Sequence, residues 1–160
     1  MRIYKTILLL FLGLIFSSIF VSCNSKTKTS ISLSKTEIAY IKNLGILENN
    51  ETIILFDTQG AFGNVKVSGN FFTEKRIASY WIDKNDTCKN DIYFAYYSDI
   101  DTITATFLTT SLTYTSYLEV QKNNGQKFKV FVDADSAETS DFFNCAIAEW
   151  IKNKKKYNTN

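Results

Sequence analysis

Between Glu51 and Asp133 the chain alternates hydrophobic and polar residues with a period of two. Ile103, Ala105 and Phe107, for example, alternate with threonines. Successive side chains of an extended chain point to opposite faces, so this spacing is typical of β-strands. Seven segments are therefore predicted to be strands: residues 52–56, 65–73, 76–83, 92–97, 102–107, 114–121 and 127–133.

The hydrophobic spacing is helical on both sides of this β-rich region. Ser34 and Glu37 form an S-x-x-E capping box, which satisfies free N–H groups at a helix start. Ile38 and Ile41 follow at helical spacing, and Gly45 is a plausible stop. We expect a short helical lead-in within residues 34–48.

A longer amphipathic helix is predicted at the C-terminal end. Ser136 or Thr139 can cap its start, and lysines gather at its negative end. Its apolar stripe consists of Phe142, Phe143, Ala146, Ile147, Trp150 and Ile151. Such a stripe must be buried, so we expect this helix to dock on the strands.

The polar segment Thr-Glu-Lys-Arg at residues 73–76 separates two apolar stretches. We interpret it as a tight turn that Thr73 caps, with Glu74 and Lys75 facing water and Arg76 beginning the next strand. An anion site built from the Arg and Lys side chains is the alternative. We favour the turn because turns of this composition are usually solvated.

The first 22 residues have the pattern of a signal peptide. Arg2 and Lys5 precede an apolar run from Ile7 to Val21, which is short for a membrane span but suits a signal sequence. The run ends at Cys23. Residues 23–33 are mostly polar and are expected to form a flexible tether.

Residues 20–23, Phe-Val-Ser-Cys, resemble the lipobox of bacterial lipoproteins. Phe20 and Val21 depart from the commonest lipobox residues. The resemblance implies that Cys23 is lipidated and anchors the mature chain to a membrane of the bacterial cell envelope. An uncleaved membrane anchor and ordinary secretory cleavage are the alternatives. No acidic cluster follows Cys23, which favours a position facing the periplasm; whether the membrane is the inner or the outer one stays open.

Charge and composition exclude several function classes. The chain has 18 Lys and Arg against 16 Asp and Glu, and two of the basic residues lie in the signal, so the mature side chains carry no formal net charge. A neutral exported protein is not expected to bind nucleic acid. The chain contains no histidine, which excludes imidazole metal sites and His-based triads. No cofactor or metal is expected, and residues 133–135 (Asp-Ala-Asp) are interpreted as a strand end followed by a helix cap.

Two groups of polar residues are candidates for chemistry or recognition. Asp83, Asp86 and Asp91 surround Cys88 in one loop, where carboxylates could serve acid–base catalysis if they were buried. In a polar loop we expect them to be exposed instead. An outward-facing subset of five tyrosines could form a recognition surface. These are Tyr93, Tyr96, Tyr97, Tyr114 and Tyr117.

Seven strands followed by one amphipathic helix is the element order of the pleckstrin-homology (PH)-like barrel. Residues 72–77, Phe-Thr-Glu-Lys-Arg-Ile, are similar to the T-[DN]-K-R-hydrophobic hairpin of bacterial PH and GRAM-type domains. Residues 97–100, Tyr-Ser-Asp-Ile, look like the Y-x-D-I segment where those domains start their second sheet. The resemblance implies a mainly β (α+β) fold over residues 51–156: a partly open seven-stranded barrel capped by the C-terminal helix and preceded by a short N-terminal helix.

The resemblance also bears on ligands. Many PH domains bind phosphoinositides through basic residues in the loop after the first strand, but residues 58–64 contain no Lys or Arg and only Lys66 follows, so phosphoinositide binding is not expected. The PH-like arrangement also implies that Cys88 and Cys145 lie too far apart for a disulfide.

The sequence thus favours a non-enzymatic, membrane-anchored binding or adaptor lipoprotein with a protein or peptide partner. The alternatives are a small envelope enzyme that uses carboxylates near Asp83–Asp91, and a purely structural envelope lipoprotein. The scaffold alone does not decide between them.

Overall fold

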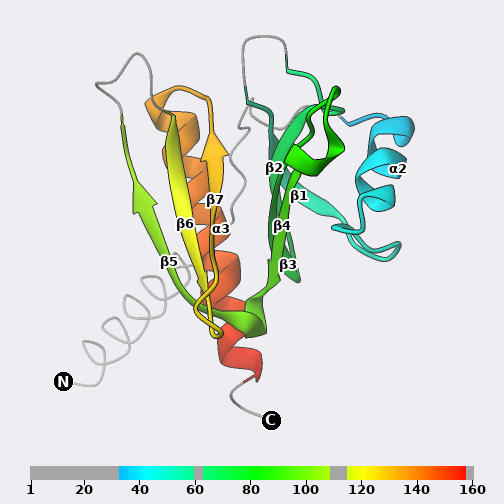
Figure 1. Cartoon of the computed structure of the whole chain (residues 1–160). Coiled ribbons are helices and arrows are strands. Elements are labelled where there is room, and N and C mark those ends of the chain that lie inside the picture. Colours follow the sequence, from blue (N-terminus) through cyan, green and yellow to red (C-terminus); the bar gives the residue numbers. More distant parts are fainter. Residues whose placement is uncertain (1–32, 60–62, 109–114, 158–160) are drawn as a thin grey trace, which may run out of the picture.

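The computed structural model describes residues 33–59, 63–108 and 115–157 (Figure 1). The predicted signal peptide, Cys23, the tether up to residue 32 and Tyr114 lie outside the described residues. Within the described part, no helix is both long and apolar enough to cross a membrane.

The seven predicted strands and both predicted helices are present among the described residues. In chain order the elements are α2 (Lys35–Asn43), β1 (Ile53–Asp57), β2 (Ser68–Thr73), β3 (Arg76–Trp81), η1 (Thr87–Lys89), β4 (Asp91–Tyr96), η2 (Tyr97–Asp99), β5 (Ile100–Thr106), β6 (Ser116–Lys122), β7 (Lys127–Val132) and α3 (Ser136–Tyr157). The sequence pattern did not predict the two short 3-10 helices, η1 and η2.

Strand β2 begins later than the period-two pattern predicted. Residues 65–67 form a turn, in which the backbone N–H groups of Val67 and Ser68 both donate to the carbonyl oxygen of Asn64, at 2.8 and 3.1 Å. The apolar side chain of Val65 is buried all the same. An alternating pattern can therefore extend into a turn whose side chains also reach the core.

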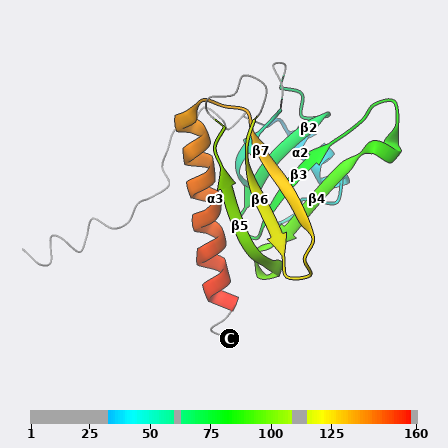
Figure 2. The same cartoon turned by 60° about the vertical axis from the view of Figure 1, so that its left-hand side comes forward.

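The strands form two antiparallel sheets, ordered β1-β2-β3-β4 and β5-β6-β7 (Figures 1 and 2). Among the described residues no strand of one sheet pairs with a strand of the other, so the sheets are not joined into a closed barrel. The chain passes from the first sheet to the second through η2, which interrupts the extended backbone between β4 and β5. The expectation of a mainly β fold with seven strands and a C-terminal helix is confirmed.

Helix α3 docks on the strands as its apolar stripe predicted. It runs alongside the three-stranded sheet in both views (Figures 1 and 2). Phe142 contacts Phe72 of the first sheet edge-to-face, with ring centroids 5.2 Å apart. Leu118 and Val130 of the second sheet belong to the same buried cluster. The main core is therefore filled jointly by both sheets and by α3.

The cap of α3 differs from the prediction. The helix begins at Ser136, so the residue before it, Asp135, caps it: its Oδ1 accepts from the backbone N–H groups of Ala137 and Glu138, both at 2.9 Å. Thr139 lies inside the first turn. Neither Ser136 nor Thr139 is the cap, whereas the interpretation of residues 133–135 as a strand end followed by a helix cap is confirmed.

Helix α2 covers the outer face of the first sheet (Figure 1). Both bonds of the predicted capping box are present, from the Glu37 N–H to Ser34 Oγ at 3.3 Å and from the Ser34 N–H to Glu37 Oε2 at 2.7 Å. Gly45 follows the helix with a φ of +77°, as a terminating glycine requires. With α2 on one face and the main core on the other, all six residues of β2 are buried.

Candidate functional site

Residues 73–76 form the turn that the sequence predicted, between β2 and β3. Thr73 caps it, because its Oγ1 accepts from the backbone N–H groups of Lys75 at 3.0 Å and Arg76 at 3.2 Å. Arg76 begins β3, as predicted, but its side chain is only 2% exposed, in contrast to the solvated side chains that are usual in such turns.

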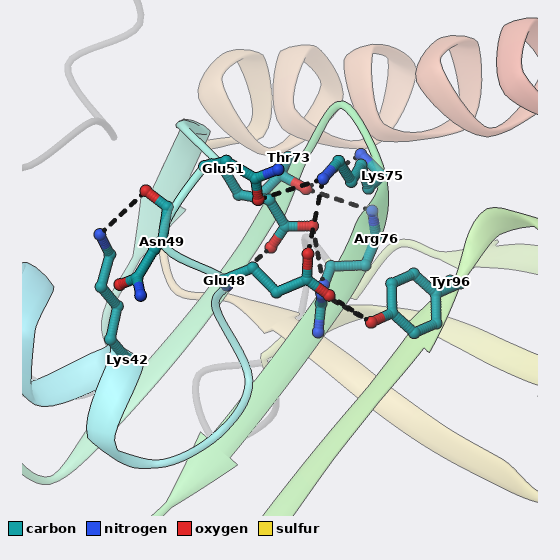
Figure 3. A network of polar contacts seen from close by, with 9 residues as sticks. Lys42, Glu48, Asn49, Glu51, Thr73, Lys75, Arg76 and Tyr96 are labelled. Atoms are coloured by element: carbon teal, nitrogen blue, oxygen red, sulfur yellow. Dashed lines mark hydrogen bonds and ion pairs between the residues drawn. The ribbon is translucent and has the colours of Figure 1, made fainter.

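The Arg76 guanidinium lies inside a cluster of polar side chains (Figure 3). Its Nε donates to Glu51 Oε1 at 3.0 Å, and its Nη2 donates to Glu48 Oε1 and to the Tyr96 hydroxyl. The guanidinium carbon also lies 4.2 Å from the centre of the Tyr96 ring. Lys75 Nζ completes the group at 3.5 Å from Glu48 Oε2. We call these five residues the Arg76 cluster.

The Arg76 cluster holds two segments of the chain together and is not an open anion site. Two carboxylates already neutralise the guanidinium, so no positive charge is left over for an external anion. The hydrogen bond from the Tyr96 hydroxyl to Glu48 lowers the pKa of that carboxyl and raises the pKa of Tyr96. Because Glu48 and Glu51 follow α2, the cluster fastens the N-terminal lead-in to the β2–β3 turn. Sequence reasoning missed this pairing because the partners are 25 and 28 residues away along the chain.

The loop carboxylates are engaged in holding their own loop. Asp83 Oδ1 accepts from the N–H groups of Asn85 and Asp86, and Asp86 Oδ1 accepts from the N–H of Cys88 at 3.0 Å. Asp91 is exposed at the start of β4. Within the described ranges no group of acidic or sulfur side chains could hold a metal ion. These contacts are those of turn caps.

The loop cysteine does not bond to the helix cysteine. Cys88 is exposed and has a free thiol, whereas Cys145 is buried in the main core on α3. The absence of a Cys88–Cys145 disulfide agrees with the expected arrangement.

The structure separates the tyrosines that the sequence grouped together. Tyr97 is fully buried and donates through its hydroxyl to the carbonyl oxygen of Thr73 at 2.8 Å. Tyr96 belongs to the Arg76 cluster, and Tyr117 is partly buried. Of the four tyrosines in this group that the structure describes, Tyr93 is the one that is exposed, at 44%. The outward-facing subset is therefore Tyr93.

Tyr93 has a second exposed aromatic side chain, Trp81, on the neighbouring strand. Trp81 is 45% exposed because it is the last residue of β3, beyond the part of that strand that the two cores cover. In the β3–β4 register Trp81 pairs with Asp91, and Ser79 pairs with Tyr93. Residues two apart on a strand share a face, so these four side chains lie on one face of the first sheet.

This face borders a hollow of about 240 Å³ between the first sheet and β7. We call it the inter-sheet groove, and its principal lining residues are Ser79, Trp81, Tyr93, Lys127, Lys129 and Phe131. A smaller hollow of about 110 Å³ adjoins it and shares Tyr93 and Lys127. The ring of Tyr93 stacks on Phe128 of β7, with centroids 5.8 Å apart, so the groove is bounded by a contact between the sheets.

Two buried side chains of the first sheet hold β7 in place beside the groove. Asn70 Oδ1 accepts from the backbone N–H of Phe131 at 3.0 Å and from the hydroxyl of Ser79 at 2.8 Å. Asp57 Oδ2 accepts from the backbone N–H of Asp133 at 2.8 Å. Burial raises the pKa of Asp57 to about 6, while that hydrogen bond opposes the rise.

A second hollow, of about 390 Å³, lies between α2 and β1. Its walls are mainly aliphatic and include Leu33, Ile38 and Ile54. Of its two charged residues, Glu51 is engaged by Arg76. This hollow is larger than the inter-sheet groove but offers fewer free polar groups for recognising a ligand.

No family model matches the chain, and a search of curated proteins finds no match. Among solved structures, the chain is similar to a protein from Shewanella loihica PV-4, described as a DUF1696 family protein with a pleckstrin-homology domain. The two are 14% identical with a TM-score of 0.43, and the match covers 69% of this chain and 93% of that one. This similarity is too low to indicate a function.

Proposed function

We propose that this protein is a non-enzymatic binding module of the bacterial cell envelope that recognises a protein or peptide in the inter-sheet groove. The observation that carries the proposal is the exposure of Trp81 and Tyr93 on one sheet face over an open hollow. Trp and Tyr contribute most to binding where they become buried in an interface, because they remove a large apolar area from water at a small entropic cost.

The proposal includes a PH-like scaffold and a lipid anchor. An antiparallel four-stranded sheet, an antiparallel three-stranded sheet and a C-terminal helix in that order support the PH-like assignment. The lipobox-like residues 20–23 support lipidation of Cys23 in a membrane facing the periplasm. The tether would then present the groove to partners near the membrane surface.

Binding is favoured over the two alternatives. For a carboxylate enzyme, the residues near Asp83–Asp91 would have to be available to a substrate, but Asp83 and Asp86 accept hydrogen bonds from their own loop. In a purely structural lipoprotein, two neighbouring aromatic side chains left about half exposed beside a hollow would favour aggregation and would have no binding role to offset this.

The test is selection of ligands from a phage-displayed random-peptide library. The full chain, purified from membranes in detergent micelles, serves as the bait. We expect enriched peptides to lose about tenfold in affinity on Trp81→Ala or Tyr93→Ala, as is usual for aromatic residues at the centre of an interface. Phe107→Ala is the matched control, because Phe107 is an aromatic residue of similar exposure (48%) that lies outside the groove and contacts Phe143.

Either of two results would overturn the proposal. One is that no peptide is enriched above the level of a bait with both groove aromatics removed. The other is that enriched peptides bind the wild type and the Trp81→Ala variant equally well. Trp81→Ala should change the unfolding midpoint little because Trp81 is about half exposed, whereas Tyr93→Ala also removes the stacking on Phe128. The unfolding midpoint of both variants is measured on the same samples, so that a loss of folding is distinguished from a loss of binding.

A further inference from the structure

The outer edge of β7 has a hydrogen-bonding pattern that bears on the class of ligand. In an antiparallel pair, alternate residues exchange backbone hydrogen bonds with the neighbouring strand, and the residues between them point their N–H and C=O groups the other way. Phe131 belongs to the second set, since its N–H donates to the side chain of Asn70 and not to β6. The N–H of Lys122 donates to the carbonyl oxygen of Gln126 just before β7. By alternation, the even-numbered residues of β7 form the hydrogen bonds to β6 and its odd-numbered residues face the outer edge.

The same alternation assigns Lys127 and Lys129 to the outer edge. They lie four and two residues before Phe131, and they pair in register with Gln121 and Glu119 of β6. No described residue forms a hydrogen bond with the backbone N–H or C=O of either lysine on this edge. Both residues are exposed and both line the inter-sheet groove. The edge is therefore closed by Asn70 and Asp57 at one end and open at the other, beside the groove.

The charge around this open edge is predominantly positive. Lys127 and Lys129 line the groove, and Lys122 lines the adjoining hollow. Lys127 Nζ lies 2.9 Å from Glu119, a contact between two exposed groups that holds the lysine only weakly. Lys129 Nζ lies over the ring of Tyr117 and forms no ion pair with a carboxylate among the residues that the structure describes. Among the described lining residues, Asp91 is the one acidic residue.

We infer that the ligand of the inter-sheet groove is an extended acidic peptide, which adds to the second sheet as a fourth strand along β7. The inference rests on the proposed function and names its ligand class. The backbone of the peptide exchanges hydrogen bonds with Lys127 and Lys129, as in other proteins that bind peptides at a free sheet edge. Alternate side chains of the peptide face Trp81 and Tyr93, and its carboxylates lie near the lysine ammonium groups.

The decisive experiment is a scan of N-methylated peptides. A peptide selected on the wild-type protein is resynthesised with one backbone N-methyl group at a time, which removes a donor while keeping every side chain. Edge pairing predicts losses of about tenfold at alternate positions and little change at the positions between them, because only every second N–H faces β7. Hydrogen exchange supplies a second readout. The Lys129 amide should become protected on binding, whereas the Val130 amide, already in the β6–β7 ladder, should not change.

Charge is tested with Lys127→Gln and Lys129→Gln in the full chain. We expect each variant to weaken an acidic peptide several-fold at low salt and to reduce the salt dependence of binding. The matched control is Lys35→Gln, a change of the same exposed side-chain type on α2, away from the groove.

The outcomes separate this inference from the proposed function. If peptides bind and depend on Trp81, but the N-methyl losses show no alternation, the groove binds side chains only and strand addition is wrong. If the selected peptides are neutral or basic, the acidic class is wrong. If no peptide is selected at all, the proposed function itself fails.

Discussion

The Nε of Arg76 lies 3.0 Å from Oε1 of Glu51, and both side chains are almost completely shielded from solvent, at 2% and 0% exposure. A buried ion pair of this kind is expensive to assemble, and its removal on one side leaves an uncompensated charge. The pair therefore adds little net stability, and its main effect is to fix the segment after α2 in one position against the β2–β3 turn.

Replacement of Arg76 by Met should lower the free energy of unfolding by about 3–5 kcal/mol, because Glu51 would remain buried without its partner. The measurement is urea unfolding at pH 7, followed by circular dichroism. Lys75→Met is the control and should change stability by less than about 0.5 kcal/mol, since Lys75 is partly exposed. The double variant Arg76→Met, Glu51→Gln should recover part of the loss. A loss below about 1 kcal/mol in Arg76→Met would show that the pair is not buried in solution.

Asp57 should make the protein less stable as the pH rises from about 4 to about 7. Burial raises the pKa of this carboxyl to about 6, and Asp133 and Glu138 add to the rise by repulsion. The folded state therefore binds the proton more tightly than the unfolded chain does. The resulting stabilisation is complete below the unfolded pKa of about 3.8 and is lost as the pH passes through about 6.

The difference in unfolding free energy between the wild type and Asp57→Asn isolates this contribution from the other carboxyl groups. An amide oxygen can still accept the N–H of Asp133, so the variant keeps that hydrogen bond. We expect the difference to change by on the order of 2 kcal/mol between pH 4 and pH 7, in the direction of a less stable wild type at pH 7. Parallel stability curves for the two proteins would contradict the raised pKa.

Gly69→Ala should destabilise the fold by about 1–3 kcal/mol through overpacking. A Cβ atom at this position would lie 2.5 Å from the ring of Tyr80 and 2.6 Å from the ring of Phe56, and both rings are buried. Thermal unfolding is the measurement. Lys66→Ala, at an exposed position just before β2, is the control for a change that meets no neighbour. An unchanged midpoint in Gly69→Ala would mean that the rings can move apart at no cost.

Cys23→Ser should abolish incorporation of radiolabelled palmitate and release the protein from the membrane fraction. Cys88→Ser, the control at an exposed free thiol, should leave both unchanged. A wild-type protein that stays in the membrane fraction without label would indicate an uncleaved anchor. A wild-type protein that is released without label would indicate ordinary secretory cleavage.

Several local features could be predicted because their physical cause lies within a few residues. The S-x-x-E pattern at Ser34 predicted both hydrogen bonds of the capping box, and Thr73 predicted the cap of the β2–β3 turn. The apolar stripe of α3 predicted that the helix docks on the strands. It did not predict that Phe142 contacts Phe72, because a stripe indicates only which face of a helix must be buried. The cap was misassigned by one residue at Asp135, because Asp, Ser and Thr can all fill that role.

The candidate site was only partly predictable. Tyr93 was among the five tyrosines proposed for recognition, but Tyr97, in η2, is fully buried, and the aromatic pattern did not distinguish the two. The exposure of Trp81 could not be predicted for a related reason. A large apolar residue at a strand end is buried or exposed according to what covers that end, and the covering elements come from elsewhere in the chain.

The type and order of the seven strands and two longer helices, the capping box of α2 and the β2–β3 turn could be predicted from the amino-acid sequence, because these features depend on neighbouring residues. Three features appear only in the folded chain: Arg76 is buried against Glu51, Trp81 and Tyr93 share a face of the first sheet, and the edge of β7 at Lys127 and Lys129 has no partner among the described residues. Each of these depends on which distant segments meet, and packing between distant segments leaves no periodic signal in either of them.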